Sequence, residues 1–567
     1  YLYTVCGWID HFKSWARDLK KRVDAGQDVA VDLIIGADMI AAAAVHAPPR
    51  EAAWHEIYAE SVRGGGPDGI ARALSAELGR LMRAHAERKY ACTQEPALEV
   101  VVDRERARFG AWYELFPRSC SPVPGKHGTF RDVEKRLSYV SAMGFDVLYL
   151  PPIHPIGHTE RKGRNNALHA GPGDPGSPWA IGSPDGGHDA IHPDLGTLED
   201  FDAFVARARE LDLEVALDLA LQCSPDHPWV KEHPEWFTTR ADGQIAYAEN
   251  PPKKYQDIYP LNFDNDPEGI YAEVARIVRM WMSHGVRIFR VDNPHTKPLP
   301  FWERLLADIA ATDPDVLFLA EAFTRPAMMH ALARIGFHQS YTYFTWRNTA
   351  GELAAYLQEL AGPAAAYMRP NFFANTPDIL SEYLQYGGPA AFKVRAVLAS
   401  LLSPSWGIYS GYELCESTPL RPGSEEYLDS EKYQYRARDW DLAEHGPAGI
   451  ASFITRLNMI RKAHPALHWL RNLRFHHVDQ PDLICFSKRS ERDSDTVLAV
   501  VNLDPHQPRE ATVWLDQAAL GVDPGSAFVV TDELSGESYQ WGPANYVRLD
   551  PMVAPAHIFT VAPCPPA

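Results

Sequence analysis

Three acidic residues stand at the ends of apolar, strand-like runs, where a catalytic carboxylate would be useful. They are Asp292 in Gly285-Val-Arg-Ile-Phe-Arg-Val-Asp, Glu321 in Phe318-Leu-Ala-Glu, and Asp378 in Asn371-Phe-Phe-Ala-Asn-Thr-Pro-Asp. A (β/α)8 barrel keeps its active site at the carboxyl ends of its strands. Retaining chemistry on an α-glucoside needs a carboxylate nucleophile and a second carboxyl group that alternates between acid and base. The three acids together suggest this reaction.

The residue two positions before Asp292 supports that interpretation. Arg290 and Asp292 share one face of a strand because side chains alternate along it. A guanidinium beside the nucleophile keeps the carboxylate ionised. Glu321 must instead hold a proton until the leaving group needs it, so we expect its pKa to be raised. Taken singly, each acid fits a buried ion pair equally well; their joint arrangement favours catalysis.

The rest of the chain predicts the elements that position these acids. Apolar residues at three- and four-residue steps from Trp8 to about Tyr90 predict a helical subdomain. Strand-like runs alternating with amphipathic stretches then predict a (β/α)8 barrel. The runs are residues 108–116, 147–150, 214–219, 286–291, 316–320, 340–344, 371–373 and 406–409. The interval from Asp218 to Gly285 is long enough to carry function. After about Arg461, short alternating strands predict a terminal β-sandwich.

Composition restricts the class of protein. The 567 residues are 46% hydrophobic, as expected for a multidomain soluble protein. With 74 acidic and 55 basic residues the formal charge is -19, which argues against a general nucleic-acid or anionic-membrane surface. Seven scattered cysteines without CxxC spacing indicate neither a disulfide framework nor a zinc site, so we expect a cytoplasmic protein. No signal peptide or membrane-spanning run is found. Because the chain starts at Tyr1 within a strand-like segment, we expect an upstream portion to be missing.

Several segments resemble the signature segments of the α-amylase superfamily and spread over most of the predicted barrel. They are residues 196–201, 285–292, 320–321, 375–378 and 409–413. The resemblance implies a barrel with a small domain inserted after the third strand and a β-sandwich behind it. It places the nucleophile at Asp292, the general acid/base at Glu321 and, at Asp378, the carboxylate that grips sugar hydroxyls in the transition state.

Two departures from that signature point to a narrower family. Gln222-Cys223 stand where an amylase has its calcium-ligand asparagine and a histidine, and Asn375-Thr-Pro-Asp378 lacks the histidine that contacts the sugar. An ordinary calcium amylase is therefore not expected. With residues 222–229, 251–259, 291–297 and 371–380, these departures resemble the GlgE-type α-1,4-glucan:maltose-1-phosphate maltosyltransferases of bacterial glucan synthesis.

The resemblance implies transfer of a maltosyl unit, with retention, from α-maltose 1-phosphate to the non-reducing end of an α-1,4-glucan. Inorganic phosphate leaves, a covalent β-maltosyl enzyme forms, and no cofactor or metal is implied. The residues expected to bind the donor are Lys162, Gln222, Lys253, Tyr255, Asp257, Asn293, Lys432 and Tyr433, with Lys253 and Tyr255 near the phosphate. Asp257 fits a turn equally well, and Tyr433 a core position.

An anionic donor requires local positive charge on this acidic protein. Arg161-Lys-Gly-Arg164 and Lys253-Lys254 supply it, although an arbitrary basic pair is more often solvated surface. Trp229, Trp236 and Tyr343 are candidates for a platform that stacks on the acceptor glucan, and core packing explains each of them at least as well.

The resemblance also implies a homodimer and a domain plan. Remnants of an N-terminal β-sandwich are expected at residues 1–10 and 95–107, a helical dimerisation subdomain at 11–94, the barrel at 108–464 with its inserted domain at 222–264, and the C-terminal β-sandwich at 465–567. Two other functions remain open: an amylase-like hydrolase or isomerase acting on neutral α-glucosides, and a non-catalytic glucan-binding protein.

Overall fold

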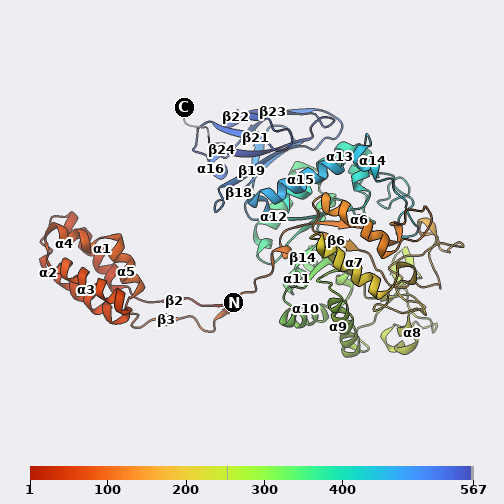
Figure 1. Ribbon diagram of the computed structural model, residues 1–567, viewed down its shortest axis with the longest axis horizontal. Helices are drawn as coiled ribbons and strands as arrows, with labels where there is room; N and C mark the ends of the chain where they lie inside the picture. The colour runs from red at the N-terminus through yellow and green to blue at the C-terminus, as the bar shows by residue number, and fades with distance from the viewer. Residues whose placement is uncertain (252, 564–567) are drawn as a thin grey trace. The chain divides into compact units, whose positions relative to one another are not determined.

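The computed structural model describes residues 1–251 and 253–563, which form two compact units (Figure 1). The first unit spans Tyr1–Val102 and the second begins at Asp103. Cys564 and the end of the predicted C-terminal domain lie outside the described residues, as does Pro252 of the loop expected near the phosphate. Within the described residues, every helix is too short or too polar to cross a membrane.

The first unit is a helical bundle with two short strand pairs. Its helices are α1 (His11–Asp24), α2 (Ala30–Ala43), α3 (Pro49–Arg63), α4 (Gly66–Ala73) and α5 (Ala76–Ala84). They enclose a core that includes Leu19, Leu33, Ile40, Val62 and Leu78. Strands β1 (Leu2–Tyr3) and β4 (Leu98–Glu99) pair antiparallel, and so do β2 (Cys6–Gly7) and β3 (Cys92–Thr93). In Figure 1, β2 and β3 run side by side from the bundle.

The second unit contains an eight-stranded parallel barrel, as the sequence predicts. The strands are β5 (Gly110–Glu114), β6 (Val147–Leu150), β7 (Glu214–Leu219), β12 (Ile288–Asp292), β13 (Leu317–Glu321), β14 (Gln339–Ser340), β15 (Asn371–Phe373) and β16 (Ser405–Tyr409). Their order is β14-β13-β12-β7-β6-β5-β16-β15, and all neighbours are parallel. A parallel bridge between Ser340 and Pro370 joins the two ends of this order. The sheet therefore closes on itself.

Side-chain alternation separates the inside of the barrel from its helical coat. Trp112, Tyr149, Ala216, Leu319 and Tyr341 belong to one buried cluster, which fills the barrel interior. Most of their immediate neighbours along the strands point the other way and join a large cluster beneath the helices. This alternation decides which polar residues at the strand ends face the inside, where the site lies.

Helices follow the strands and cover the barrel. They are α6 (Phe130–Ala142), α7 (Leu198–Glu210), α9 (Pro267–Ser283), α10 (Leu299–Thr312), α11 (Pro326–Arg334), α12 (Ala350–Ala361), α13 (Glu382–Leu402) and α15 (Ala451–Ala463). Capping boxes begin α6, α7 and α12, where a threonine and an acid three residues later bond each other's backbone N–H groups. Each such cap contributes about 1 kcal/mol.

One predicted segment differs in detail from the structure. The predicted strand 340–344 is only β14, after which Tyr343–Trp346 form a 3-10 turn. The Thr342 side chain accepts the Phe344 N–H, and this local bond favours a turn over continued pairing.

The interval after Asp218 holds β8 (Gln222–Cys223), α8 (Pro228–Glu232) and β9 (Ala248–Asn250), followed by β10 (Lys253–Tyr255) and β11 (Tyr259–Pro260).

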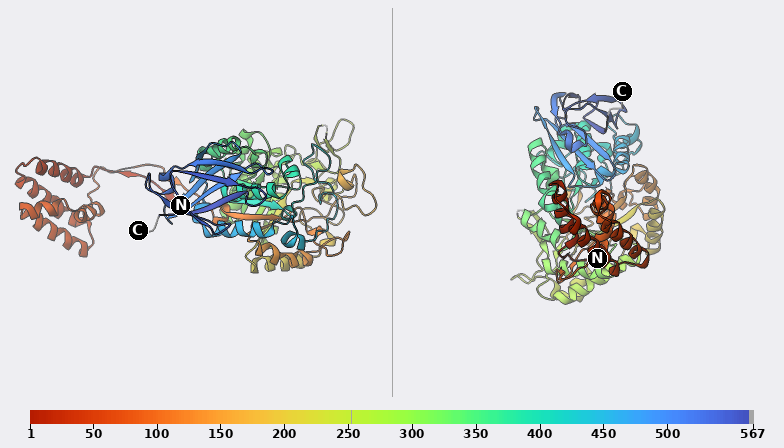
Figure 2. Two further views of the ribbon diagram at one scale, coloured as in Figure 1. Left: turned by 90° about the horizontal axis from the view of Figure 1, so that it is seen from above. Right: turned by 90° about the vertical axis from the view of Figure 1, so that its left-hand side faces the viewer.

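An antiparallel β domain follows the barrel (Figure 2). Its strands are β17 (Leu473–Val478), β18 (Leu483–Ser490), β19 (Asp495–Asn502), β20 (Arg509–Trp514), β21 (Phe528–Asp532), β22 (Ser538–Trp541), β23 (Ala544–Leu549) and β24 (Ala556–Pro563). They pair in the order β22-β21-β24-β19-β18-β17-β20-β23. One face encloses its own core, and the other face, with Phe486 and Val501, joins the core of the barrel. This shared core holds the β domain on the barrel.

Candidate active site

Two carboxylates lie side by side at the carboxyl ends of neighbouring strands. Asp292 ends β12 and Glu321 ends β13, and the two residues are directly opposite in the parallel register. Neighbouring strands are about 4.8 Å apart, and register partners point to the same face. Side chains placed in this way are compatible with the carboxyl separation of about 5–5.5 Å that retaining glycosidases use, whereas inverting enzymes need a wider gap. The side chains of Asp292 and Glu321 are only 9% and 13% exposed.

A single guanidinium holds the two acids together. Arg290 Nη1 lies 2.9 Å from Asp292 Oδ1, and Arg290 Nη2 lies 3.6 Å from Glu321 Oε1. The same Nη1 lies 3.0 Å from Asp218 Oδ2, at the end of β7. Tyr149, from β6, donates its hydroxyl to that Asp218 oxygen. Four adjacent strands thus contribute to one buried hydrogen-bonded group, with Arg290 at its centre.

Burial raises the pKa of two carboxyl groups in this cluster. Burial raises the pKa of Glu321 to about 8, and the Asp292 charge adds to the rise while Arg290 opposes it. The direction matches the sequence expectation for an acid that must carry a proton at neutral pH. Burial also raises the pKa of Asp218 to about 7 against the opposing effect of Arg290. Glu321 is therefore mostly protonated near neutrality.

The turn after Asp292 aims a backbone N–H at Glu321. Asn293 has φ 43° and ψ 53°, in the left-handed region, and its N–H donates to Glu321 Oε2 at 3.1 Å. Its amide Nδ2 lies 3.3 Å from Asp292 Oδ2. Lys297 Nζ donates to the carbonyls of Asp292 and Asn293, each at 3.3 Å. A lysine ammonium therefore clamps the strained turn that joins the two carboxylates.

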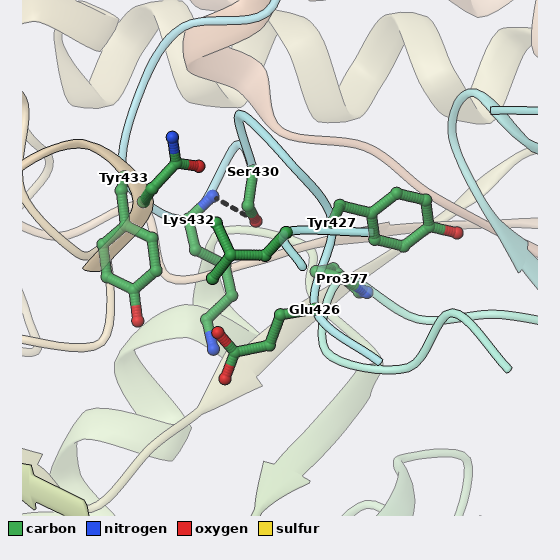
Figure 3. Close-up of a pocket in the computed structure, with 8 residues that line it drawn as sticks. Pro377, Glu426, Tyr427, Ser430, Lys432 and Tyr433 are labelled. Carbon is green, nitrogen blue, oxygen red and sulfur yellow. Dashed lines mark hydrogen bonds between the residues drawn. The ribbon is translucent and has the colours of Figure 1, made fainter. Parts of the chain in front are cut away.

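Asp378 occupies a different environment from the other two acids. Its side chain is 47% exposed and forms an ion pair with Lys432. Lys432 also lies over the rings of Trp179 and Tyr433, at 5.5 and 5.8 Å. Burial lowers the pKa of Lys432, but the charge and hydrogen bond of Asp378 together with Tyr433 and Glu426 outweigh burial, so the net pKa is raised. Figure 3 shows Lys432 extending beside the Tyr433 ring toward the carboxylate of Glu426.

Several predicted donor-binding residues converge around Lys432. Asp257 is buried, its Oδ1 has no hydrogen-bond partner among the described residues, and burial raises its pKa while Lys162 lowers it. Lys162 is also buried and donates to Gln256 Oε1 at 2.7 Å. Gln222 Nε2 lies 3.5 Å from the carbonyl of Trp179, the residue under Lys432. A buried oxygen without a partner beside two lysines leaves a place for a polar ligand group.

Lys253 and Tyr255 lie on the rim rather than among the buried groups. Lys253 is 58% exposed and its Nζ lies 3.1 Å from Glu426 Oε1, and Tyr255 is partly buried on the same strand, β10. Of the acceptor candidates, Trp229 and Trp236 are buried, Trp229 stacked on His188. Core packing therefore accounts for these two tryptophans. Tyr343 is only partly buried, and its hydroxyl donates to the Thr324 carbonyl.

The structure also brings in residues that the sequence reasoning did not assign to the site. Asp218, Glu114 and Lys297 surround Arg290 and the two acids, and Trp179 lies under Lys432. A weaker signal was present for two of them: Glu114 and Asp218 are the acids that interrupt the apolar runs 108–116 and 214–219 near their carboxyl ends. Lys297 had no such signal, because its role depends on the turn that it closes.

Two groups of metal-type side chains occur in the described residues. His188, Cys223 and His227 are buried together, but Trp229 N–H, His227, His188 and the Ala220 carbonyl form one continuous hydrogen-bond chain. Each imidazole nitrogen in that chain already has a partner.

The second group is His127, His192 and Asp194. Burial lowers the pKa of His192 to about 4, with further lowering from His127 and the nearby Arg118 and Arg161. Those two cations disfavour a divalent ion, so neither group is assigned a metal.

The barrel, its strand-end carboxylates and the appended β domain define the α-amylase class of proteins. An α-amylase from Lactobacillus plantarum matches with TM-score 0.62 and 20% identity, over 81% of this chain and 100% of that one. A maltogenic amylase from Thermotoga neapolitana matches with TM-score 0.60 and 20% identity, over 81% and 99%. The sequence model "Alpha amylase, catalytic domain" matches residues 57–269.

Sequence relatives narrow the class to one family. The models "Alpha-1,4-glucan:maltose-1-phosphate maltosyltransferase, domain N/S" and "GLGE, C-terminal" match residues 1–104 and 475–561. Alpha-1,4-glucan:maltose-1-phosphate maltosyltransferase 2 of Streptomyces coelicolor is 59% identical over 569 residues, covering 99% of this chain and 84% of the relative. The Mycobacterium tuberculosis enzyme is 53% identical over 575 residues, covering 99% and 81%. The chain belongs to the α-1,4-glucan:maltose-1-phosphate maltosyltransferase family, a family of glycosyltransferase enzymes.

Proposed function

We propose that this protein transfers maltosyl units from α-maltose 1-phosphate to the non-reducing end of an α-1,4-glucan, with retention of configuration. The observation that carries the proposal is the register pair of Asp292 and Glu321, which puts two carboxyl groups on the same face of adjacent strands, an arrangement that supports double displacement. The family relatives are named for this donor and acceptor class. Lys253 on the rim supplies positive charge that a phosphorylated donor needs on an acidic protein.

In the first step, an Asp292 oxygen attacks the anomeric carbon and the bond from that carbon to the phosphate oxygen breaks. Glu321 gives its proton to the departing phosphate, which leaves as hydrogen phosphate. Arg290 bridges both acids and stabilises the carboxylate that each becomes in turn. The product is a β-maltosyl ester on Asp292.

In the second step, Glu321 is ionised and takes the proton from the acceptor 4-hydroxyl. That oxygen attacks the anomeric carbon, the ester bond breaks, and Asp292 is released as a carboxylate. Two inversions give net retention. Asp378 is proposed to grip sugar hydroxyls in both transition states; its present partner is Lys432, so binding of the sugar would exchange one hydrogen-bond partner for another.

The donor contacts are proposed for the remaining predicted residues. Lys162, Gln222, Asp257 and Tyr433 lie around Lys432 and Trp179, where they would bind the maltosyl unit. Asn293, beside the nucleophile, is a further donor contact, and Lys253 and Tyr255 are assigned to the phosphate side of the donor. Water must be kept out of this part of the site, because it would otherwise hydrolyse the ester intermediate.

Product analysis separates this proposal from the alternatives. The protein is supplied with α-maltose 1-phosphate and a short maltooligosaccharide, and phosphate and chain length are followed together. Growth by two glucose units with stoichiometric phosphate supports transfer. Free maltose as the main product would instead indicate a hydrolase, and no phosphate release with intact sugar binding would indicate a glucan-binding protein.

The proposal includes a cytoplasmic homodimer joined through the helical subdomain, residues 11–94. Exposed apolar side chains on α2 and α3 support the interface, namely Val31, Ile34, Ile35, Trp54 and Ile57. The six described cysteines are free, which fits a reducing compartment. Light scattering after Trp54→Glu tests the dimer: a monomer supports this interface, and an unchanged mass contradicts it.

A further inference from the structure

One buried carboxyl group at the top of the barrel has no role in the mechanism above. Glu114 ends β5, the residue is only 2% exposed, and its carboxyl group makes no hydrogen bond or ion pair with the described residues. Buried polar groups in folded proteins are almost always paired, and an unpaired carboxyl is costly to bury. Its burial without a partner therefore needs an explanation.

The barrel register places Glu114 inside the site. Two residues earlier on the same strand, Trp112 belongs to the cluster that fills the barrel interior, so Glu114 points to the same side. Glu114 is the register partner of Tyr149, another interior residue, whose hydroxyl bonds Asp218. Glu114 therefore faces the barrel interior, within electrostatic reach of Arg290, Asp218 and Asp378.

The charges around Glu114 disfavour an additional anion. Arg290 is the positive group that acts on it, against three acids, Asp218, Asp378 and Glu431, and Arg290 is already engaged by three carboxylates. Burial, together with those acids, raises the pKa of Glu114 well above its ordinary value. A protonated carboxyl has one O–H donor and one carbonyl acceptor, a combination that suits a sugar hydroxyl.

We propose that Glu114 is a donor-binding residue whose carboxyl group hydrogen-bonds a hydroxyl group of the sugar unit held against Asp292. This inference rests on the proposed function, because it takes the sugar at that position to be the transferred one. It makes Glu114 a determinant of specificity for the donor, since a buried group left unpaired by a deoxy sugar or a smaller ligand costs affinity.

The test compares three variants by steady-state phosphate release. Glu114→Gln keeps the size, a donor and an acceptor, and is expected to keep kcat/KM for the donor within about threefold. Glu114→Leu removes both groups and is expected to lower kcat/KM on the order of tenfold. Glu114→Asp keeps the chemistry and shortens the reach, and is expected to lose nearly as much as Glu114→Leu. Thermal unfolding confirms that each variant folds, and Glu114→Asp carries the test if Glu114→Leu does not fold.

Singly deoxygenated α-maltose 1-phosphates identify the bonded hydroxyl. For the wild-type protein one deoxy donor should lose about tenfold in kcat/KM, and the same donor should lose nothing further with Glu114→Leu. Equal losses in both proteins for every deoxy donor, or wild-type kinetics for both Glu114→Leu and Glu114→Asp, would overturn the role. Calorimetric binding of maltose to wild-type and Glu114→Leu protein makes the same comparison without turnover, so a wild-type protein that releases no phosphate refutes the proposed function alone.

Discussion

The two halves of the site are built from different parts of the fold. Asp292, Glu321 and Arg290 lie on adjacent strands, are nearly buried, and bond one another. Asp378, Lys432 and Lys253 come from loops or from the inserted segment; Asp378 and Lys253 are about half exposed, and the two lysines are held by acids of this same protein.

The difference suggests a division of work. Strand-end groups are held by the hydrogen bonds of the sheet, so their spacing exists before any ligand arrives. Loop cations that are already paired must exchange partners when a phosphorylated sugar binds, which makes the loop half adjustable. We therefore expect changes in the strand half to affect the chemical step and changes in the loop half to affect donor affinity.

Removing the nucleophile should give the largest effect. Asp292→Ala is expected to lower kcat for phosphate release by about 10⁴-fold or more, because no other described carboxylate has its place beside Glu321 in the register. Asp315→Ala is the matched control, since Asp315 is 55% exposed and precedes β13 at the opposite end of the barrel. A variant of Asp292 that kept wild-type turnover would refute the division between the two halves.

The protonation of Glu321 predicts a pH dependence. The first step needs the protonated acid, so kcat/KM for the donor should be constant below the pKa of Glu321 and fall about tenfold per pH unit above about 8. Glu321→Gln should be slower by about 10²–10⁴-fold and should lose this decline. A wild-type profile that is flat through pH 9 would contradict Glu321 as the acid.

Lys297 tests whether the turn contributes to the strand half. Lys297→Met should lower kcat on the order of tenfold and move the alkaline decline to higher pH. The Asn293 N–H bond and the Lys297 charge each favour the ionised form of Glu321, so losing them raises the pKa of Glu321. The rate falls because the second step uses ionised Glu321. Lys297→Arg keeps the charge and donors and should restore part of the rate. If Lys297→Met changes only KM, Lys297 belongs with the loop half.

The rim lysine should give the smallest effect. Lys253→Met is expected to raise KM for the donor about threefold at low salt and less at high salt, because an exposed charge is strongly screened. Lys254→Met is the matched control on the same strand, since its side chain points to the other face. Equal effects of both substitutions would mean that only net charge matters at this rim.

The barrel and the main acids were predictable because they depend on short-range patterns. Alternating apolar runs that end in an acid identified β12 and β13, and the threonine–acid pairs at helix starts are local as well. The segment 340–344 shows the limit of such reasoning, since the Thr342 side chain turns the backbone where β-forming residues predict a strand.

What the sequence by itself determined is therefore the set of elements and the placement of Asp292, Glu321 and Asp378 at their ends. Only the tertiary structure decided which groups meet. Asp218 joins Arg290 across 72 residues of chain, Asp378 pairs with Lys432 rather than with the buried acids, and Glu114 faces the same interior without a partner. The physical reason is that strand register and loop closure bring together residues distant in the chain, and neither is encoded in the spacing of any one motif.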